Sequence, residues 1–191
     1  GDSRDGFLQW GSGVGTNPKD PSLVRDAQLV SVLPAPMMPQ STLTGVQQVD
    51  QGQTFNVPMG LTGVTLSVYQ YVYAQDLTLH YDPLKLQLGS VTSLKEGFQV
   101  IDQQEDVPGH VRIKLASLGE GKGVLAQGDL LAFRFTAKSG TQESSTTVSV
   151  GNVIISNGLS NGQANELQVG GASREIQINL PSISVDKLAL N

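Results

Sequence analysis

The sequence predicts an all-β protein built as one β-sandwich without a long helix, and three observations support this. Apolar and polar residues alternate with the period of two that is typical of strands with one buried face, most clearly in residues 76–82, 111–115 and 130–137. Gly, Pro and Asn residues separate the alternating segments at short intervals. The 191 residues, of which 38% are hydrophobic and 15% charged, are enough for one sandwich with extensions.

The segment from Val64 to Ala137 contains the clearest strands. Its central strand must end at Pro83, because proline has no N–H to donate to a neighbouring strand. Leu84, Leu86 and Leu88 alternate with polar residues and predict a second short strand directly after this proline. The inward positions of the central strand and of two later strands predict a core containing Leu77, Leu79, Tyr81, Ile113, Leu115, Phe133 and Phe135.

Further strands are expected on both sides of this segment, at residues 28–33, 43–46, 53–61, 64–73, 96–102, 146–150, 152–156 and 175–180. Polar turns are expected at residues 103–109 and 157–165. This pattern divides the chain into three parts. They are an N-terminal extension with a Pro-rich linker (1–40), the sandwich (41–180), and a linker or the start of a following helical module (181–191). The lack of a signal peptide at Gly1 suggests a fragment of a longer chain.

Three motifs follow one another in an informative order. They are Asp-Leu-Thr-Leu-His-Tyr-Asp-Pro at 76–83, Val-Arg-Ile-Lys-Leu-Ala-Ser-Leu-Gly at 111–119 and Gly-Asp-Leu-Leu-Ala-Phe-Arg-Phe-Thr-Ala-Lys at 128–138. This series resembles the cohesins, the receptor modules that capture dockerin modules in cellulosomes and in secreted glycosidases. The resemblance covers roughly residues 42–180 and implies a jelly-roll sandwich of about nine strands.

The resemblance also implies a function and a face that performs it. A dockerin helix would lie on the sheet face that contains the strand ending at Pro83, and Asp76 occupies the position of an aspartate that binds dockerin in many cohesins. Ala74 stands where the best-known type often has asparagine, which favours another type with a more apolar contact. Calcium would belong to the dockerin, with no cofactor in this chain. The module would be bacterial, and secreted or on the cell surface.

The predicted docking patch combines this strand face with a glycine-rich loop. The strand offers the polar groups of Asp76, Thr78 and His80, and the loop at 118–124 adds apolar side chains between glycines. The candidate protein-binding residues are Asp76, Thr78, His80, Leu118, Gly119, Glu120 and Val124. The alternative is a solvated face without a ligand, since half of the residues of such a strand point outward in any sandwich.

A carbohydrate-binding module on a similar jelly roll is the second hypothesis. It would stack sugar rings on Trp10 and on Tyr69, Tyr71 and Tyr73, which share one face of the predicted 64–73 strand. These tyrosines could equally cover one end of the core. Aromatic residues make up only 5% of the chain and include a single Trp, which favours protein binding. A ligand-free spacer between catalytic modules is the third hypothesis.

The residue pattern does not predict catalysis. His80 and His110 are the only histidines, whereas a zinc site needs three or four ligands, so we interpret His80 as a solvated strand residue. Glu105 and Asp106 stand beside Pro108, where solvated turn charges are expected rather than glycosidase carboxylates. The chain contains no G-x-S-x-G motif and no P-loop. We expect a non-catalytic module, although its parent chain could be a glycoside hydrolase.

Charge and hydropathy restrict the partners further. The net charge of −5 argues against nucleic acid and anionic membranes as partners. No apolar run approaches the roughly 18 residues that a membrane-spanning helix needs. Without cysteine, the sandwich cannot depend on disulfides.

Overall fold

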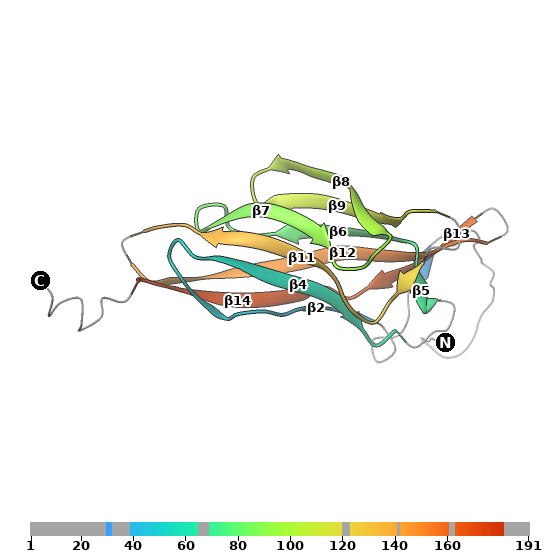
Figure 1. Ribbon diagram of the computed structural model, residues 1–191, viewed down its shortest axis with the longest axis horizontal. Coiled ribbons are helices and arrows are strands. Elements are labelled where there is room, and N and C mark those ends of the chain that lie inside the picture. The colour runs from blue at the N-terminus through green and yellow to red at the C-terminus, as the bar shows by residue number, and fades with distance from the viewer. Residues whose placement is uncertain are drawn as a thin grey trace, which may run out of the picture.

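The computed structural model describes residues 30–31, 39–64, 69–119, 123–140, 142–160 and 163–181. These residues form strands joined by turns, without an α-helix among them, which confirms the all-β prediction. The strands run along the long axis of an elongated sandwich (Figure 1). The predictions for Trp10, for the rest of residues 1–29 and for the tail 182–191 lie outside the described residues.

The larger sheet has the strand order β1–β13–β12–β6–β9–β8, and β14 and β3 extend it beside β12. Its pairs are antiparallel except for β1 with β13 and β14 with β3. The strands are β1 (Val30–Ser31), β3 (Gln48–Asp50), β6 (Ala74–His80), β8 (Phe98–Val107), β9 (His110–Ser117), β12 (Ser144–Ser160), β13 (Gln163–Val169) and β14 (Ala172–Asn179).

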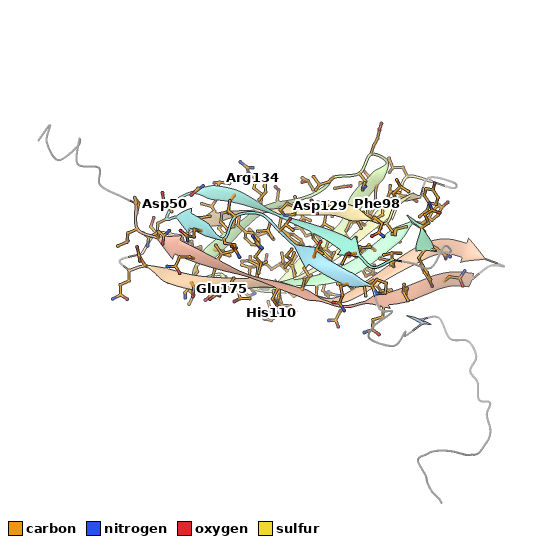
Figure 2. All side chains as sticks on the ribbon, turned by 90° about the horizontal axis from the view of Figure 1, so that it is seen from below. Asp50, Phe98, His110, Asp129, Arg134 and Glu175 are labelled. Atoms are coloured by element: carbon orange, nitrogen blue, oxygen red, sulfur yellow. The ribbon has the colours of Figure 1, made fainter. Side chains whose placement is uncertain are left out.

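The smaller sheet is antiparallel and has the order β2–β4–β11–β7. Its strands are β2 (Gln40–Leu43), β4 (Thr54–Thr62), β7 (Leu86–Ser93) and β11 (Gly128–Ala137). A separate two-stranded ribbon joins β5 (Tyr71–Val72) to β10 (Val124–Leu125). Figure 2 shows Arg134 of the smaller sheet and His110 of the larger sheet on opposite surfaces of the molecule. Each sheet therefore has an outward face of its own.

The core lies between the two sheets and confirms the predicted inward positions of six residues. Leu77, Leu79, Ile113, Leu115, Phe133 and Phe135 are all buried. Tyr81 differs, because it lies beyond the end of β6 and is only half-buried, with its ring edge against Phe135 at 5.3 Å between centroids. Tyr81 therefore closes the margin of the core instead of filling its centre.

The strand predicted over residues 64–73 is wrong for the part of this range that the structure describes. Only Tyr71 and Val72 form a strand, and residues 65–68 lie outside the described part of the chain. Tyr69 and Val72 are buried, whereas Tyr71 is exposed and Tyr73 is half-buried. The three tyrosines therefore do not share one face. Burial here recurs three positions apart, because the segment crosses the end of the sandwich instead of running along a sheet.

The predicted strand start at Leu84 is also wrong. The Asp82 carboxylate accepts a hydrogen bond from the Leu84 N–H at 2.9 Å, and the Asp82 carbonyl accepts those of Lys85 and Leu86. Such Asx turns compete with extended backbone. Leu84 is consequently 84% exposed on a turn, and β7 begins at Leu86, whose side chain is buried.

Two predicted turns are largely strand. β8 continues to Val107, so the turn predicted at 103–109 shrinks to Pro108 and Gly109. β12 runs unbroken from Ser144 to Ser160, so the two strands expected around Gly151 are one strand with a bulge. β12 and β13 together also occupy most of the turn predicted at 157–165. The polar residues of these segments led to the prediction of turns. Strands of this sheet also carry polar residues, because one face of the sheet is solvated.

Candidate functional site

The outward face of the larger sheet is centred on β6. Gln75, Leu77 and Leu79 point into the core, so Asp76, Thr78 and His80 point outward, as the sequence predicts. On one side, β9 places Lys114, Arg112 and His110 opposite these three residues in that order. On the other side, β12 places Ile154, Gly151 and Ser149 opposite them. Residues far apart in the sequence therefore form one continuous surface.

A shallow pocket of about 300 Å³ lies on this outward face. Side chains from all four strands β8, β9, β6 and β12 surround it. They include Asp76, Thr78, Asp102, Arg112, Lys114, Asn152 and Ile154. The pocket carries both signs of charge, and the aliphatic residues Leu77, Ile113 and Ile154 also line it. Such a surface suits a partner that offers hydrogen-bond donors together with a small apolar contact.

The charges of this face are only loosely paired. The Lys114 ammonium lies 3.9 Å from the Asp76 carboxylate, and both side chains are about half exposed, at 54% and 51%. Arg112 donates hydrogen bonds to Asp106 at 3.2 Å and to Gln104 at 2.5 Å. Exposed ion pairs of this kind contribute only about 0–1 kcal/mol, because water solvates both charges. Asp76 can therefore exchange its lysine for a partner's donor at small cost.

A β-bulge in β12 shapes the pocket wall. Three steps along β12, from Gly151 to Ile154, oppose two steps along β6, so β12 has one extra residue at this point. Asn152 occupies the bulge with φ at 49°, the only positive φ of a non-glycine residue in the described chain. Sequence analysis did not identify Asn152 or Ile154. The Gly151-Asn152 dipeptide inside a strand pattern was the available signal, since glycine there often marks a bulge.

The loop after β9 contributes less than predicted. Leu118 is 60% exposed, and its N–H bonds to the Gly97 carbonyl at 2.8 Å. Gly119 follows with φ at 144°, and Glu120 lies outside the described residues. The prediction that Val124 contacts a partner is wrong, because Val124 pairs with Val72 in the ribbon and is buried, with 7% exposure. Val124 therefore belongs to the core, which leaves Leu118 as the apolar contact of this loop.

The tyrosine platform of the carbohydrate-binding hypothesis does not form. Tyr69 is buried, and the Tyr73 ring packs so closely on Gly123 that an added Cβ there would lie 2.7 Å from it. Of the three tyrosines, Tyr71 alone is exposed, at about half of its surface, beside the exposed Leu125 of the same ribbon. A row of stacking aromatics is therefore not available on this segment.

The acidic pair near Pro108 is exposed, as predicted, but it lies on a strand instead of in a turn. Glu105 and Asp106 lie on β8, and Glu105 accepts hydrogen bonds from the Tyr81 hydroxyl and the Gly109 N–H. Glu105 is thus a structural hydrogen-bond acceptor rather than a free turn charge.

The described residues contain no helix with the length and hydrophobicity that a membrane span requires.

A two-sheet sandwich whose larger sheet offers an open polar face has the architecture of a binding module. Residues 39–178 match the family model of the cohesin domain, so the chain belongs to the cohesin family. This match confirms the resemblance found in the sequence motifs, and the jelly-roll sandwich agrees with it. Cohesin modules are non-catalytic domains.

Solved structures share the fold. A cohesin module from a Clostridium perfringens family 33 glycoside hydrolase is 23% identical, with a TM-score of 0.63, over 76% of this chain and 99% of that one. The seventh ScaB type I cohesin of Pseudobacteroides cellulosolvens is 15% identical, with a TM-score of 0.59, over 75% and 95%. The sixth cohesin of Acetivibrio cellulolyticus scaffoldin B, solved in complex with a mutant Cel5 dockerin, is 19% identical, with a TM-score of 0.52, over 74% and 99%. No curated protein matches the chain.

Proposed function

We propose that this module binds a dockerin on the outward face of β8, β9, β6 and β12. The observation that carries the proposal is the pocket on this face, where four strands bring Asp76, Asp102, Arg112 and Asn152 together on the surface of a cohesin sandwich. The bound dockerin would bring its parent enzyme to this chain and so assemble secreted carbohydrate-active enzymes. The Acetivibrio cellulolyticus neighbour, solved with a dockerin, supports this class of partner.

The chemistry of the face suggests how the dockerin is held. Asp76 offers a carboxylate that accepts hydrogen bonds from hydroxyl or amide donors, and Thr78 offers a hydroxyl beside it. Ile154 and the exposed Leu118 supply apolar contacts, with Leu118 four residues beyond Lys114 along the chain. Gly119 and Glu120 complete the proposed loop contact. Ala74 adds no side-chain hydrogen bond to this recognition.

The remaining expectations follow from this partner. Calcium would be bound by the dockerin's loops, and this chain would need no cofactor for docking. The module would act outside a bacterial cell or on its surface, and it would contribute binding while any glycoside hydrolase activity belongs to other parts of its parent protein.

Calorimetry with a panel of dockerins tests the proposal. Asp76→Ala and Leu118→Ala should each weaken binding by about 1–3 kcal/mol, because each removes a contact at the docking face. Asp129→Ala is the matched control for the first change, since Asp129 is exposed on β11 of the opposite sheet. Val46→Ala is the control for the second, since Val46 is 42% exposed before β3. Equal effects of site and control variants would place the docking surface elsewhere.

A polysaccharide gel-shift panel distinguishes the alternatives. Retardation by a polysaccharide that Tyr71→Ala abolishes, without binding to any dockerin, would replace the proposal with carbohydrate binding through the exposed Tyr71. A module that binds neither class of ligand would act as a spacer.

A further inference from the structure

The two histidines of the chain lie face to face on neighbouring strands. His80 is the last residue of β6, His110 is the first of β9, and the two are direct partners in the strand register. Their Nδ1 atoms are 2.8 Å apart, and the rings meet edge to face with centroids 4.7 Å apart at 84°. His110 is exposed and His80 is half-buried, so solvent reaches the pair.

The backbone holds this pair in place. The Gly109 carbonyl accepts a hydrogen bond from the Tyr81 N–H at 3.0 Å, directly beside both histidines. Gly109 has φ at 86°, and an added Cβ there would lie 2.3 Å from the Tyr81 carbonyl oxygen. The Gly109 N–H donates to Glu105 at 2.9 Å. The two strand ends are therefore fixed at close range, and the imidazoles converge without any backbone movement.

The spacing of the nitrogen atoms matches that of two adjacent metal ligands. Metal–imidazole bonds of about 2.0 Å at right angles, as in a square-planar or tetragonal complex, separate the two nitrogen atoms by about 2.8 Å. The two Nδ1 atoms are already 2.8 Å apart in the hydrogen-bonded pair, which equals this separation. To bind one ion, each ring would turn from its hydrogen-bonding orientation so that its lone pair points at the ion.

We propose that His80 and His110 form a chelating site for one divalent late transition-metal ion, with Cu(II) preferred. Imidazole suits Cu(II), Ni(II) and Zn(II), and Cu(II) binds most tightly to a given nitrogen ligand set. When both rings are neutral and no metal is bound, one Nδ1–H donates a hydrogen bond to the other Nδ1. On binding, that proton leaves Nδ1, and the same ring takes up a proton at Nε2. Two metal–nitrogen bonds replace one hydrogen bond, with no net change in bound protons.

The neighbouring groups leave the other coordination positions open. Ser149 lies opposite His80 on β12, and Thr78 and Arg112 lie one step further along the same outward face. Arg112 donates hydrogen bonds to Gln104 and Asp106 of β8, so its guanidinium is engaged by that strand. No group of three or more His, Cys, Asp or Glu side chains suited to a metal occurs in the described ranges. Water or a donor from a bound partner would complete the coordination.

This proposal departs from the interpretation of His80 as an isolated solvated residue. That interpretation assumed a single imidazole, because His110 is 30 residues away in the sequence. The strand register supplies the second ligand, and two ligands held on neighbouring strands of one sheet bind an ion more tightly than either does alone. The chain has only these two histidines and no cysteine, so the site can be tested without competing imidazole or thiol ligands.

Titration of the full chain with CuCl2 in a non-coordinating buffer, followed by calorimetry and electron paramagnetic resonance, tests the site. We expect one Cu(II) per chain and hyperfine splitting from two imidazole nitrogens. His80→Gln and His110→Gln should each lower the affinity at least about tenfold, or about 1.4 kcal/mol. The double variant should bind no more tightly than either single variant, because each single variant keeps one imidazole and the double variant has none. Most of the affinity should be lost with the first substitution, because the chelate is lost with its first ligand. The double variant also measures any binding to the N-terminal amine or to carboxylates.

Three outcomes would overturn the proposal. The first is equal binding by the wild type and the double variant. The second is single variants that each retain wild-type affinity, as two independent surface histidines would. The third is a wild-type spectrum with one coordinated imidazole nitrogen or none, and this result needs no variant to fold. Thermal unfolding of each variant without metal serves as the folding control, since both substitutions leave the buried side of the strands unchanged.

Discussion

The Tyr81 hydroxyl donates a hydrogen bond of 2.6 Å to the Glu105 carboxylate and so joins the end of β6 to the edge strand β8. The same carboxylate oxygen accepts the Gly109 N–H, which ties the hairpin between β8 and β9 to this contact. Burial of the ring raises the pKa of the Tyr81 hydroxyl above its ordinary value, and the hydrogen bond and negative charge of Glu105 raise it further. The hydroxyl therefore keeps its proton in the folded protein under conditions where an unfolded chain loses it.

Stability should consequently fall as the solution becomes alkaline. A tyrosine whose folded pKa is raised stabilises the fold below the unfolded pKa of about 10 and loses this contribution as pH rises above it. Tyr81→Phe should cost about 1 kcal/mol near neutral pH, where it removes one hydrogen bond. The wild-type advantage should shrink above about pH 10. Urea unfolding of both proteins across this range measures the difference, and a constant difference would contradict the coupling to Glu105.

Gln75 points into the core from β6, with 1% exposure, and its amide nitrogen and oxygen have no hydrogen-bond partner among the described residues. A buried polar group without a partner costs about 1–3 kcal/mol, so Gln75→Met should raise the unfolding free energy by up to that amount. Urea unfolding checks this. Destabilisation by Gln75→Met would show that the amide finds a partner in solution, such as a buried water molecule.

The bulge in β12 predicts that two substitutions of Asn152 change the stability of the fold by different amounts. Asn152→Gly should change stability by less than about 0.5 kcal/mol, because glycine adopts positive φ freely. Asn152→Val should cost about 1–2 kcal/mol, because a branched side chain is strained in this region of φ. Thermal unfolding compares the two variants, and equal stability would show that the bulge relaxes. If Asn152 contacts the dockerin, both variants should also lose affinity.

Substitutions of Val124 and Asp76 should affect different properties, the first the stability of the fold and the second the affinity for dockerin. Val124→Ala removes buried methyl groups and should cost about 2 kcal/mol of stability, with dockerin affinity unchanged for the folded fraction. Asp76→Ala should leave stability nearly unchanged and weaken docking, because its carboxylate is half exposed on the outward face. Unfolding curves and calorimetry on the same samples measure both effects. A loss of docking by Val124→Ala alone would restore this residue to the interface.

Substitution of Phe133 tests how much the core contributes to the stability of the fold. Its ring is fully buried in β11 beside Phe135, with centroids 6.5 Å apart. Phe133→Ala should therefore cost about 3–5 kcal/mol. The matched control is Leu84→Ala on the exposed turn after Asp82, which should cost less than about 0.5 kcal/mol. Denaturant unfolding distinguishes them, and similar small losses from both would mean that the core closes around the missing ring.

Local alternation was enough to predict β6, β9 and β11, together with the outward position of Asp76 and the burial of Phe133. In a half-buried strand, the period of two records which face meets the core, whatever strand lies alongside. The same logic failed for the segment that ends at Tyr73. A segment that crosses the end of a sandwich without regular structure also buries apolar residues. The spacing of its buried residues depends on the path of the backbone and does not follow a period of two.

The family, the sandwich, most of the core and the polar character of the outward strand face can all be inferred from the order of the residues. The burial of Val124, the place of Asn152 in the pocket and the contact between His80 and His110 become visible only in the folded chain. These three features depend on the register between strands that are distant in the sequence. Register is set by the packing of the whole sheet and by single bulges, and a one-residue shift would send each of these side chains to the opposite face.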